Sequence, residues 1–346
     1  MLNNKNQKGM IVFIIIAVVV VLVTIFKFMM PVGEAAPVER IVQKNNYRNP
    51  FSLLTNPAVQ NKVTHLPGQK YIARLYIEGT IQEENMTYNQ DWLLDTIDEL
   101  ASDPYNVGMI LDINSPGGTV YEADELYLAL LEYRKTEKPV YAYFESMAAS
   151  GGYYIACAAT KIVANRNTLT GSIGVIAGQS LDLTGLMEKY GVKSETIHAG
   201  KNKNMGNYNE PLSDEQREIL QSIADECYEQ FTGIVAEARN MKIERVQELA
   251  DGRVYTAKQA LGAGLVDSIG SFDDAVDLME KNHFYGDKGV FVEDYKYQRD
   301  MSFYDYLRGF SSKIVPGKAD SITGLPEAVE KIIDPELKYP AFIYEQ

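Results

Sequence analysis

The sequence has few residues that could cross-link the chain or bind a metal ion. Its 346 residues include only two cysteines and three histidines. Cys157 and Cys227 lie far apart, each within an apolar pattern of helical spacing, so we expect two buried thiols and no disulfide framework. His65, His198 and His283 show none of the spacings that a zinc site requires, so the sequence predicts neither a metal nor any other cofactor.

Positive charge is also scarce. The chain has 33 Lys and Arg against 47 Asp and Glu, giving a formal charge of −14 at pH 7, and no basic stripe runs along it. Because nucleic-acid binding depends on clustered Lys and Arg, this balance argues against nucleic acid as a partner. The hydrophobic content of 46% excludes overall disorder, and the length allows one or two folded domains.

A long apolar segment stands near the N-terminus. Residues 9–26, GMIVFIIIAVVVVLVTIF, carry no charge, and the apolar character continues to residue 31. This length is enough to cross a bilayer core. Because Lys5 and Lys8 precede the segment, we expect residues 1–8 in the cytoplasm, a transmembrane anchor at 9–31 in the cell membrane, and the rest of the chain outside the cytoplasm. A cleaved signal peptide is the alternative, although the apolar run is longer than the usual apolar h-region of a signal peptide.

Beyond the anchor, the pattern divides the chain into three parts. Residues 32–69 are rich in Asn, Pro and Gln without periodicity, which is typical of a tether. Residues 70–290 alternate short strands with helices, so we expect one α/β domain around a largely parallel sheet. Residues 291–346 form a C-terminal extension that is aromatic-rich and less regular, and the sequence gives it no role.

Within the α/β domain, individual elements can be placed from their patterns. Strands are predicted at 71–81, 106–115, 139–146 and 161–165, helices at 122–135, 183–191 and 213–240, and an extended segment at 192–200. Two capping boxes, Ser213 with Gln216 and Thr256 with Gln259, predict helix starts.

A glycine turn follows one of the predicted strands. Residues 115–118, Ser-Pro-Gly-Gly, come after the buried strand that ends at Asn114. The backbone N–H groups of Gly117 and Gly118 are not covered by side chains and are therefore suited to stabilising an oxyanion. An ordinary connection between a strand and a helix explains the same four residues.

A second segment, FESMAASGGYYIACAAT at residues 144–160, contains a candidate nucleophile. Ser150 stands where the strand passes into a small-residue helix, at the positive end of the helix dipole. Gly151 and Gly152 leave room for a substrate backbone near that hydroxyl. Ser146 is the rival serine, and close packing of a glycine-alanine helix explains the segment without any catalysis.

A third segment, TIHAGKNKNMG at residues 196–206, offers candidates for a general base. His198 is the first of them, but no acidic partner accompanies it. Lys201 and Lys203 are the alternatives, and either lysine would have to be deprotonated by burial near a hydroxyl such as that of Ser172. Lysines in loops are usually solvated, so the spacing alone does not decide among these residues.

Together, five segments resemble one family. SPGGTV, SMAASGGYYIA, TLTGSIGV, HAGKNKN and DGRVYTAKQALGAGLVD occur in the order typical of the signal peptide peptidase A family of bacterial membrane-anchored serine proteases, in the ClpP/crotonase superfamily. The resemblance spans residues 70–285. It implies a single copy of a ClpP/crotonase-like fold of repeated β-β-α units, and a serine endopeptidase with a Ser/Lys dyad that degrades cleaved signal peptides without a cofactor.

The resemblance also implies the site residues. The roles are Ser150 as nucleophile, Lys203 as general base with Lys201 as its rival, Ser172 as the hydroxyl that orients the lysine, Gly117 and Gly118 as the oxyanion hole, and Gly151 and Gly152 as substrate-binding residues. A single-copy member is expected to form a homo-oligomer, in which the serine and the lysine of one site can come from adjacent protomers.

Three other functions are compatible with parts of the pattern. A related membrane protease would cut the tails of membrane proteins with the same residues. A crotonase-type acyl-CoA enzyme would use the glycine turn but would leave Ser150 and Lys203 without a role. An inactive scaffold would keep the fold and lack the chemistry.

Overall fold

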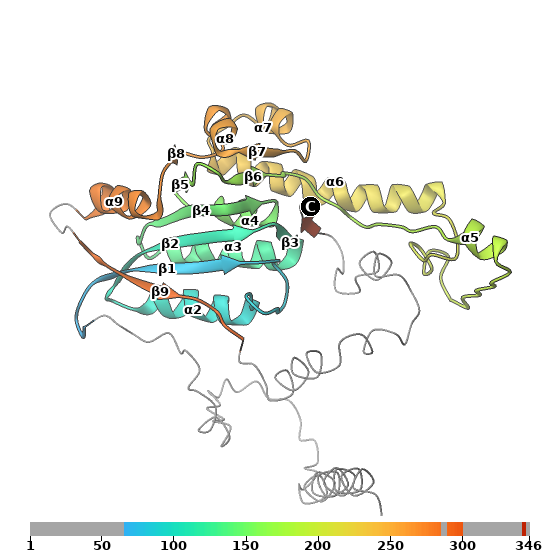
Figure 1. Cartoon of the computed structure of the whole chain (residues 1–346), viewed down its shortest axis with the longest axis horizontal. Helices are drawn as coiled ribbons and strands as arrows, with labels where there is room; N and C mark the ends of the chain where they lie inside the picture. The colour runs from blue at the N-terminus through green and yellow to red at the C-terminus, as the bar shows by residue number, and fades with distance from the viewer. Residues whose placement is uncertain (1–65, 285–288, 300–340, 344–346) are drawn as a thin grey trace, which may run out of the picture. The chain divides into compact units, whose positions relative to one another are not determined.

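The computed structural model of the chain describes residues 66–284, 289–299 and 341–343 (Figure 1). The chain divides into two units, Met1–Asn56 and Pro57–Gln346, and all described residues belong to the second. The expected anchor at 9–31 and most of the expected tether lie outside the described residues. None of the described helices combines the length and the apolar character needed to span a membrane.

A mixed, mostly parallel sheet forms the centre of the described unit (Figure 1). Its main path runs β7-β6-β4-β2-β1-β9, while β5 pairs with β4 and β8 pairs with β5. Only the β6–β7 pair is antiparallel among the described strands of this sheet. The bounds are β1 (Tyr71–Glu78), β2 (Asn106–Ser115), β4 (Val140–Ala149), β5 (Lys161–Ala164), β6 (Leu169–Gly171), β7 (Val254–Thr256), β8 (Ser268–Ile269) and β9 (Phe291–Tyr295). The expected α/β class is therefore confirmed.

A second, two-stranded sheet lies at the carboxyl end of β2. It pairs β3 (Gly117–Thr119) with β10 (Ala341–Ile343) in antiparallel register, so a segment from the C-terminal extension lies against the glycine turn. Figure 1 shows β10 beside β3 at the end of the main sheet.

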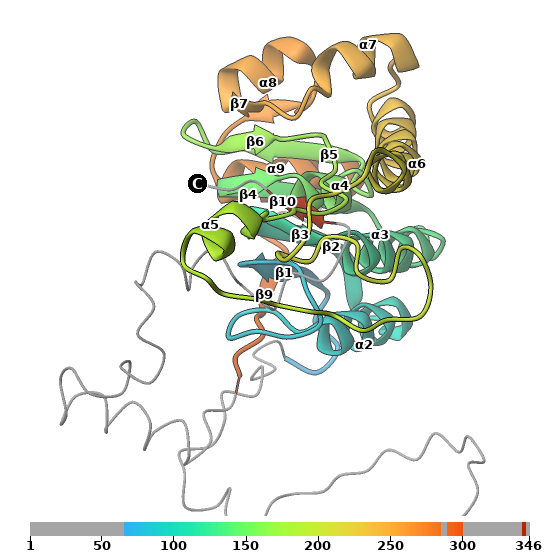
Figure 2. The ribbon, with the colours of Figure 1, turned by 90° about the vertical axis from the view of Figure 1, so that its right-hand side faces the viewer.

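Helices cover both faces of the main sheet (Figure 2). The helices α2, α3 and α4 pack on one face, and α9 packs on the other. The bounds are α2 (Gln90–Ser102), α3 (Val120–Arg134), α4 (Gly151–Ala156), α5 (Thr184–Lys189), α6 (Asp214–Ala238), α7 (Ile243–Leu249), α8 (Ala257–Ala263) and α9 (Phe272–His283).

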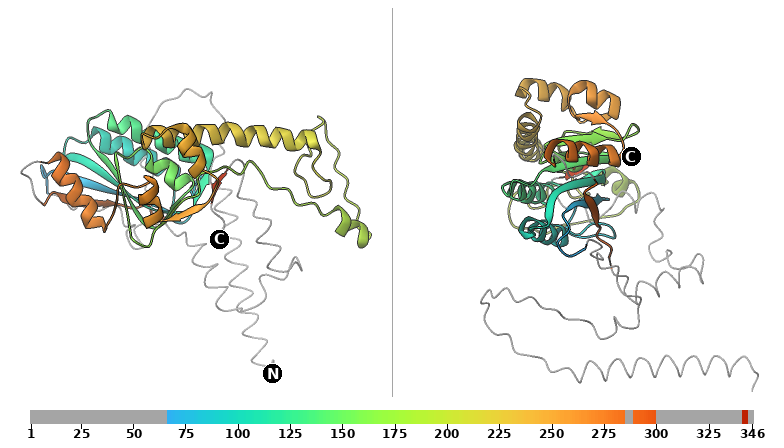
Figure 3. Two further views of the ribbon diagram at one scale, coloured as in Figure 1. Left: turned by 90° about the horizontal axis from the view of Figure 1, so that it is seen from above. Right: turned by 90° about the vertical axis from the view of Figure 1, so that its left-hand side faces the viewer.

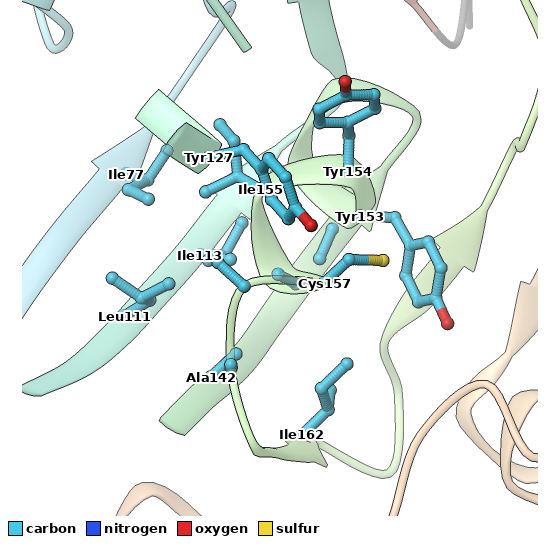
Figure 4. Packing of buried hydrophobic residues seen from close by; sticks show 14 of the residues in the cluster. Ile77, Leu111, Ile113, Tyr127, Ala142, Tyr153, Tyr154, Ile155, Cys157 and Ile162 are labelled. Atoms are coloured by element: carbon cyan, nitrogen blue, oxygen red, sulfur yellow. The ribbon is translucent and has the colours of Figure 1, made fainter. Parts of the chain in front are cut away.

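The alternation of side chains along the strands builds two separate cores. In β1, Leu75 and Ile77 face the larger cluster under α2, α3 and α4, whereas Ile72 faces the smaller cluster under α9. Figure 4 shows strand residues of the larger cluster, such as Ile113, packed against side chains of α4. Cys157 belongs to this core, as expected, while Cys227 is half-buried and both thiols are free.

Most of the predicted elements are present, with differences at the edges. The strand at 106–115 matches β2, and both predicted capping boxes form, at Ser213 with Gln216 and at Thr256 with Gln259. The segment 192–200 contains no strand, contrary to the extended prediction, because it pairs with no neighbouring strand. The helix after Ser150 has only six residues, since Thr160 already bonds back to β4.

Residues 176–222, here called the arm, project from the main sheet. The helix α5 has no buried residue, and after Gln216 the next buried residue of α6 is Phe231. Figures 1 and 3 show α5 and the first half of α6 extending past the edge of the sheet. Large apolar side chains of the arm are exposed: Ile176, Leu181, Leu186, Tyr190, Val192, Ile197 and Tyr208.

Candidate active site

Ser150 occupies the strand-to-helix junction that the sequence predicts, and its backbone is strained. It follows β4 and caps α4 with φ 53° and ψ −116°, a conformation that a residue with a side chain rarely adopts. Its N–H donates to the carbonyl of Gly171 at 2.8 Å, and its own carbonyl accepts from the N–H of Tyr154 at 2.9 Å. Such a conformation costs about 1–3 kcal/mol, and residues that keep it tend to lie at functional sites.

The hydroxyl of Ser150 is buried without a partner. The residue is 1% exposed, and within the described part of the chain its Oγ makes no hydrogen bond. The rival Ser146 is exposed, and its Oγ donates to Asn114 Oδ1 at 2.7 Å. A buried hydroxyl with unused hydrogen-bonding capacity is costly in a purely structural role, so the geometry favours Ser150 over Ser146.

The glycines after Ser150 allow α4 to lie directly on β3. A Cβ atom on Gly151 would come within 3.2 Å of the Gly118 nitrogen, and one on Gly152 within 3.2 Å of the Ser115 carbonyl oxygen. The close packing that the sequence analysis gave as an explanation without catalysis is therefore present. It also places the serine next to the glycine turn, while a role of these glycines in substrate binding stays a prediction.

The glycine turn presents its two N–H groups differently. Gly117, with φ 104°, donates its N–H to Ser115 Oγ at 3.1 Å, so this group is already engaged. On the same edge of β3, Ile81 donates to the Gly117 carbonyl at 2.8 Å and accepts from Thr119 at 2.9 Å. Because backbone groups of successive strand residues point to opposite edges, Gly118 faces the other edge, where β10 pairs. The N–H of Gly118 therefore points to the edge that β10 occupies in this structure, and the oxyanion role of the two glycines stays a prediction.

Ser172 lies one residue beyond the group that binds the Ser150 amide. It follows Gly171, is 6% exposed, has φ 49°, and donates its N–H to the Arg253 carbonyl at 2.8 Å. The structure therefore places two serines with positive φ directly after the adjacent strands β4 and β6.

None of the three candidate bases reaches Ser150 within one copy of the chain. His198 is exposed and its Nδ1 lies 3.0 Å from the Gly200 carbonyl oxygen. Lys201 forms an ion pair with Glu215, which lowers the pKa of that carboxyl. Lys203 is exposed in the arm, and its side chain has no hydrogen bond or ion pair among the described residues. The serine and both glycines are brought together, and the lysine is not.

A second buried polar group lies on the face of the sheet toward α9. Asp112 in β2 is 1% exposed and accepts hydrogen bonds from Arg74 in β1, with Nε at 2.7 Å from Oδ2. Burial raises the pKa of Asp112 to about 6, partly offset by the Arg74 guanidinium. Its other oxygen, Oδ1, is buried and unpaired among the described residues. The pair lies outside the site around Ser150.

Comparisons with known proteins identify relatives of this chain. The model of Peptidase family S49 matches residues 132–284. The chain is 34% identical over 278 residues to a putative signal peptide peptidase SppA from Enterococcus faecium, which covers 78% of each chain. It is 34% identical over 208 residues to Protease 4 from Salmonella typhi, covering 59% of this chain and 33% of that one. A solved structure of a ClpP1 mutant from Listeria monocytogenes is similar with a TM-score of 0.40 and 20% identity, over 59% of this chain and 94% of that one.

A buried serine with an unpaired hydroxyl stands at the strand-to-helix junction beside β3, an arrangement suited to a serine nucleophile. The chain belongs to peptidase family S49 and is a serine-type peptidase. The resemblance to the signal peptide peptidase A family is thereby confirmed.

Two parts of the site were not predicted from the sequence. Ile81, which holds one edge of β3, follows the first strand and carries no sequence signal beyond its apolar character. The pairing of β10 with β3 joins segments more than two hundred residues apart, and only the apolar triplet at 341–343 hints at a strand.

Proposed function

We propose that this chain is a membrane-anchored endopeptidase that degrades cleaved signal peptides, with Ser150 as nucleophile and Lys203 as general base. The observation that carries the proposal is the Ser150 hydroxyl: buried, unpaired among the described residues, held at a positive φ, and adjacent to β3. The positive φ and the unpaired buried hydroxyl both lower the stability of the fold, and both are typical of residues at functional sites.

The proposed reaction proceeds through an acyl-enzyme. Neutral Lys203 accepts the Ser150 proton while Oγ attacks the peptide carbonyl, and the N–H of Gly118 stabilises the oxyanion. The lysine then donates the proton to the leaving amine. Water, activated by the same lysine, hydrolyses the ester and restores the Ser150 hydroxyl. Ser172 is proposed to orient the lysine when it is in place.

The pairing of β10 supports an extended peptide as the substrate. Phe342 stands opposite Gly118 in antiparallel register, so the edge of β3 that faces away from Ile81 accepts a backbone strand, here β10, next to Ser150. Peptides often bind by adding a strand to such an edge. An acyl-CoA substrate would have no use for strand pairing, so this contact favours the peptidase over the crotonase-type alternative.

The arm supports a site that is shared between copies. Lys203 is exposed in the arm, far along the chain from the buried serine, and Ser150 has no base among the described residues. Exposed apolar residues of the arm, Leu186, Tyr190 and Ile197, are the kind of surface that a subunit contact covers. We propose that a homo-oligomer places Lys203 of one copy beside Ser150 of the next.

The substrate and the location are proposed on separate grounds. One relative carries the name signal peptide peptidase, and signal peptides have apolar central segments that suit a membrane-proximal protease. The uncharged run at 9–26 supports a membrane anchor at 9–31 with the catalytic domain outside the cytoplasm. Tails of membrane proteins are the alternative substrates, and a panel of both peptide types distinguishes them by kcat/KM.

A fluorophosphonate probe on the full chain tests the nucleophile and the base. We expect the probe to label the wild type and not Ser150→Ala, and Lys203→Ala to lose peptidase activity. Lys201→Ala is the matched control, since Lys201 pairs with Glu215, and it should keep activity. Labelling of Ser150→Ala at the wild-type rate would contradict the nucleophile.

Mixing two inactive variants tests the shared site. If Ser150 and Lys203 come from different copies, Ser150→Ala mixed with Lys203→Ala recovers part of the activity. Absence of recovery after subunit exchange, demonstrated by a fluorescent label, would contradict the sharing.

Extraction of membranes with alkaline carbonate, with and without residues 9–31, tests the anchor.

A further inference from the structure

The structure offers a positioning residue that the mechanism above does not use. Ser150 and Ser172 both have positive φ, and both are held through residues around Gly171. We infer that Tyr255 in β7 is a positioning residue, whose ring fixes Gly171 and thereby the backbone of Ser150. The inference rests on the proposed role of Ser150.

The first step is the contact between Gly171 and Ser150. The Gly171 carbonyl accepts the Ser150 N–H at 2.8 Å, and Ala149 stands opposite Gly171 in the β4–β6 register. Any displacement of the Gly171 peptide therefore moves the donor–acceptor pair that orients Ser150. Because Ser150 has an unfavourable φ, it depends on this bond more than a relaxed residue does.

The second step is the contact between Tyr255 and Gly171. A Cβ atom on Gly171 would lie 2.6 Å from Tyr255 Cδ2, so the ring lies directly against the Gly171 backbone. Gly171 also has φ +84°, a conformation that strongly favours glycine. The ring thus occupies the volume that a side chain at residue 171 would fill, and it limits the movement of this peptide.

The third step is the anchoring of Tyr255 itself. The residue is 8% exposed, and its hydroxyl donates to the Leu249 carbonyl at 2.8 Å, at the end of α7. Its strand neighbour Arg253 accepts the N–H of Ser172 at 2.8 Å. Residues 253–255, at the start of β7, therefore hold both serines, Ser172 directly and Ser150 through Gly171.

Amide exchange and probe labelling of the full chain test the inference. We expect Tyr255→Leu to raise the exchange rate of the Ser150 amide and to slow fluorophosphonate labelling by about tenfold to a hundredfold, because a small misplacement of a reacting group has effects of this size. Tyr255→Phe loses only the bond to the Leu249 carbonyl and keeps the ring against Gly171, so both readouts should lie much closer to the wild-type values than in Tyr255→Leu. Gly171→Ala, which pushes against the ring, should act like Tyr255→Leu and serves if that variant does not fold.

Tyr133→Leu is the matched control for the loss of a buried tyrosine. Tyr133 is 1% exposed and donates to Asn106 Oδ1 at 2.5 Å, where β2 begins, at the other end of the strands from Ser150. It should lower the melting temperature without changing exchange at Ser150 or the labelling rate of the folded protein.

The outcomes separate this inference from the proposed function. Unchanged exchange at Ser150 in Tyr255→Leu and Gly171→Ala would overturn the positioning role, whatever the catalytic result. Raised exchange with unchanged labelling would overturn it as well. Labelling that persists in Ser150→Ala would instead overturn the proposed nucleophile, and the exchange data would still decide what Tyr255 holds.

Discussion

Replacing Gly118 with alanine should push β3 away from Ile81, the residue that bonds to one of its edges. A Cβ atom at this position would lie 1.7 Å from the Ile81 carbonyl oxygen and 2.5 Å from its carbonyl carbon, so β3 and Ile81 must move apart. The φ of Gly118 is not positive, which means that this contact, and not backbone strain, is the effect of the added methyl group. The hydrogen bonds of Ile81 with Gly117 and Thr119 would be broken or stretched.

The magnitude follows from the contacts that are lost. Two backbone hydrogen bonds contribute about 0.5–1.5 kcal/mol each, and overpacking costs about 1–3 kcal/mol, so the free energy of unfolding should fall by roughly 2–6 kcal/mol. If Gly118 supplies the oxyanion donor, displacement of its N–H should also lower kcat by about 10²- to 10³-fold. Stability is measured by denaturant unfolding, and catalysis by peptide hydrolysis under conditions where the variant is folded.

Gly233→Ala is the control for this experiment. Gly233 lies inside α6 with open space around its Cα, so alanine should stabilise the helix by about 0.5–1 kcal/mol and leave activity unchanged. A Gly118→Ala protein with wild-type stability and wild-type kcat would refute the reasoning, because it would mean that β3 can move away from Ile81 without consequence.

Four further predictions follow from individual contacts. Tyr153→Phe leaves the Leu265 carbonyl without its donor and should cost about 1–3 kcal/mol in denaturant unfolding, while an unchanged midpoint would contradict that bond. Burial raises the pKa of Asp112 to about 6, so the folded protein holds this proton more tightly than the unfolded chain does. The free energy of unfolding of the wild type, relative to Asp112→Asn, should therefore fall as the pH rises from about 4 to 6. A difference that does not change with pH would contradict the burial of Asp112. Deletion of residues 341–346 should speed fluorophosphonate labelling by exposing β3. If Lys203 acts between copies, activity per chain should fall on dilution as the oligomer dissociates, and a constant value for monomers would contradict sharing.

The sequence predicts those parts of the fold that depend on local patterns. The strand at 106–115 is found because its apolar run is bounded by turn residues, and the capping box at Ser213 and Gln216 is found because both partners lie within one turn. The contact of Ile81 with Gly118 and the pairing of β10 with β3 join segments that are far apart in the sequence. A local sequence pattern does not predict such contacts. The extended prediction for 192–200 was wrong because strand character needs a partner strand, and the arm offers none.

The candidate site separates into a part that one chain completes and a part that it leaves open. The strained backbone of Ser150 is held by β6 and β7 within the same copy, so the proposed nucleophile has its conformation before any substrate or base arrives. Lys203, in contrast, is exposed in the arm and makes no hydrogen bond with Ser150 within the same copy. If the proposed sharing holds, Lys203 of a neighbouring copy meets Ser150 only on assembly. Assembly would then complete the proposed site, so that an isolated chain carries the serine in a fixed conformation without the group proposed to activate it.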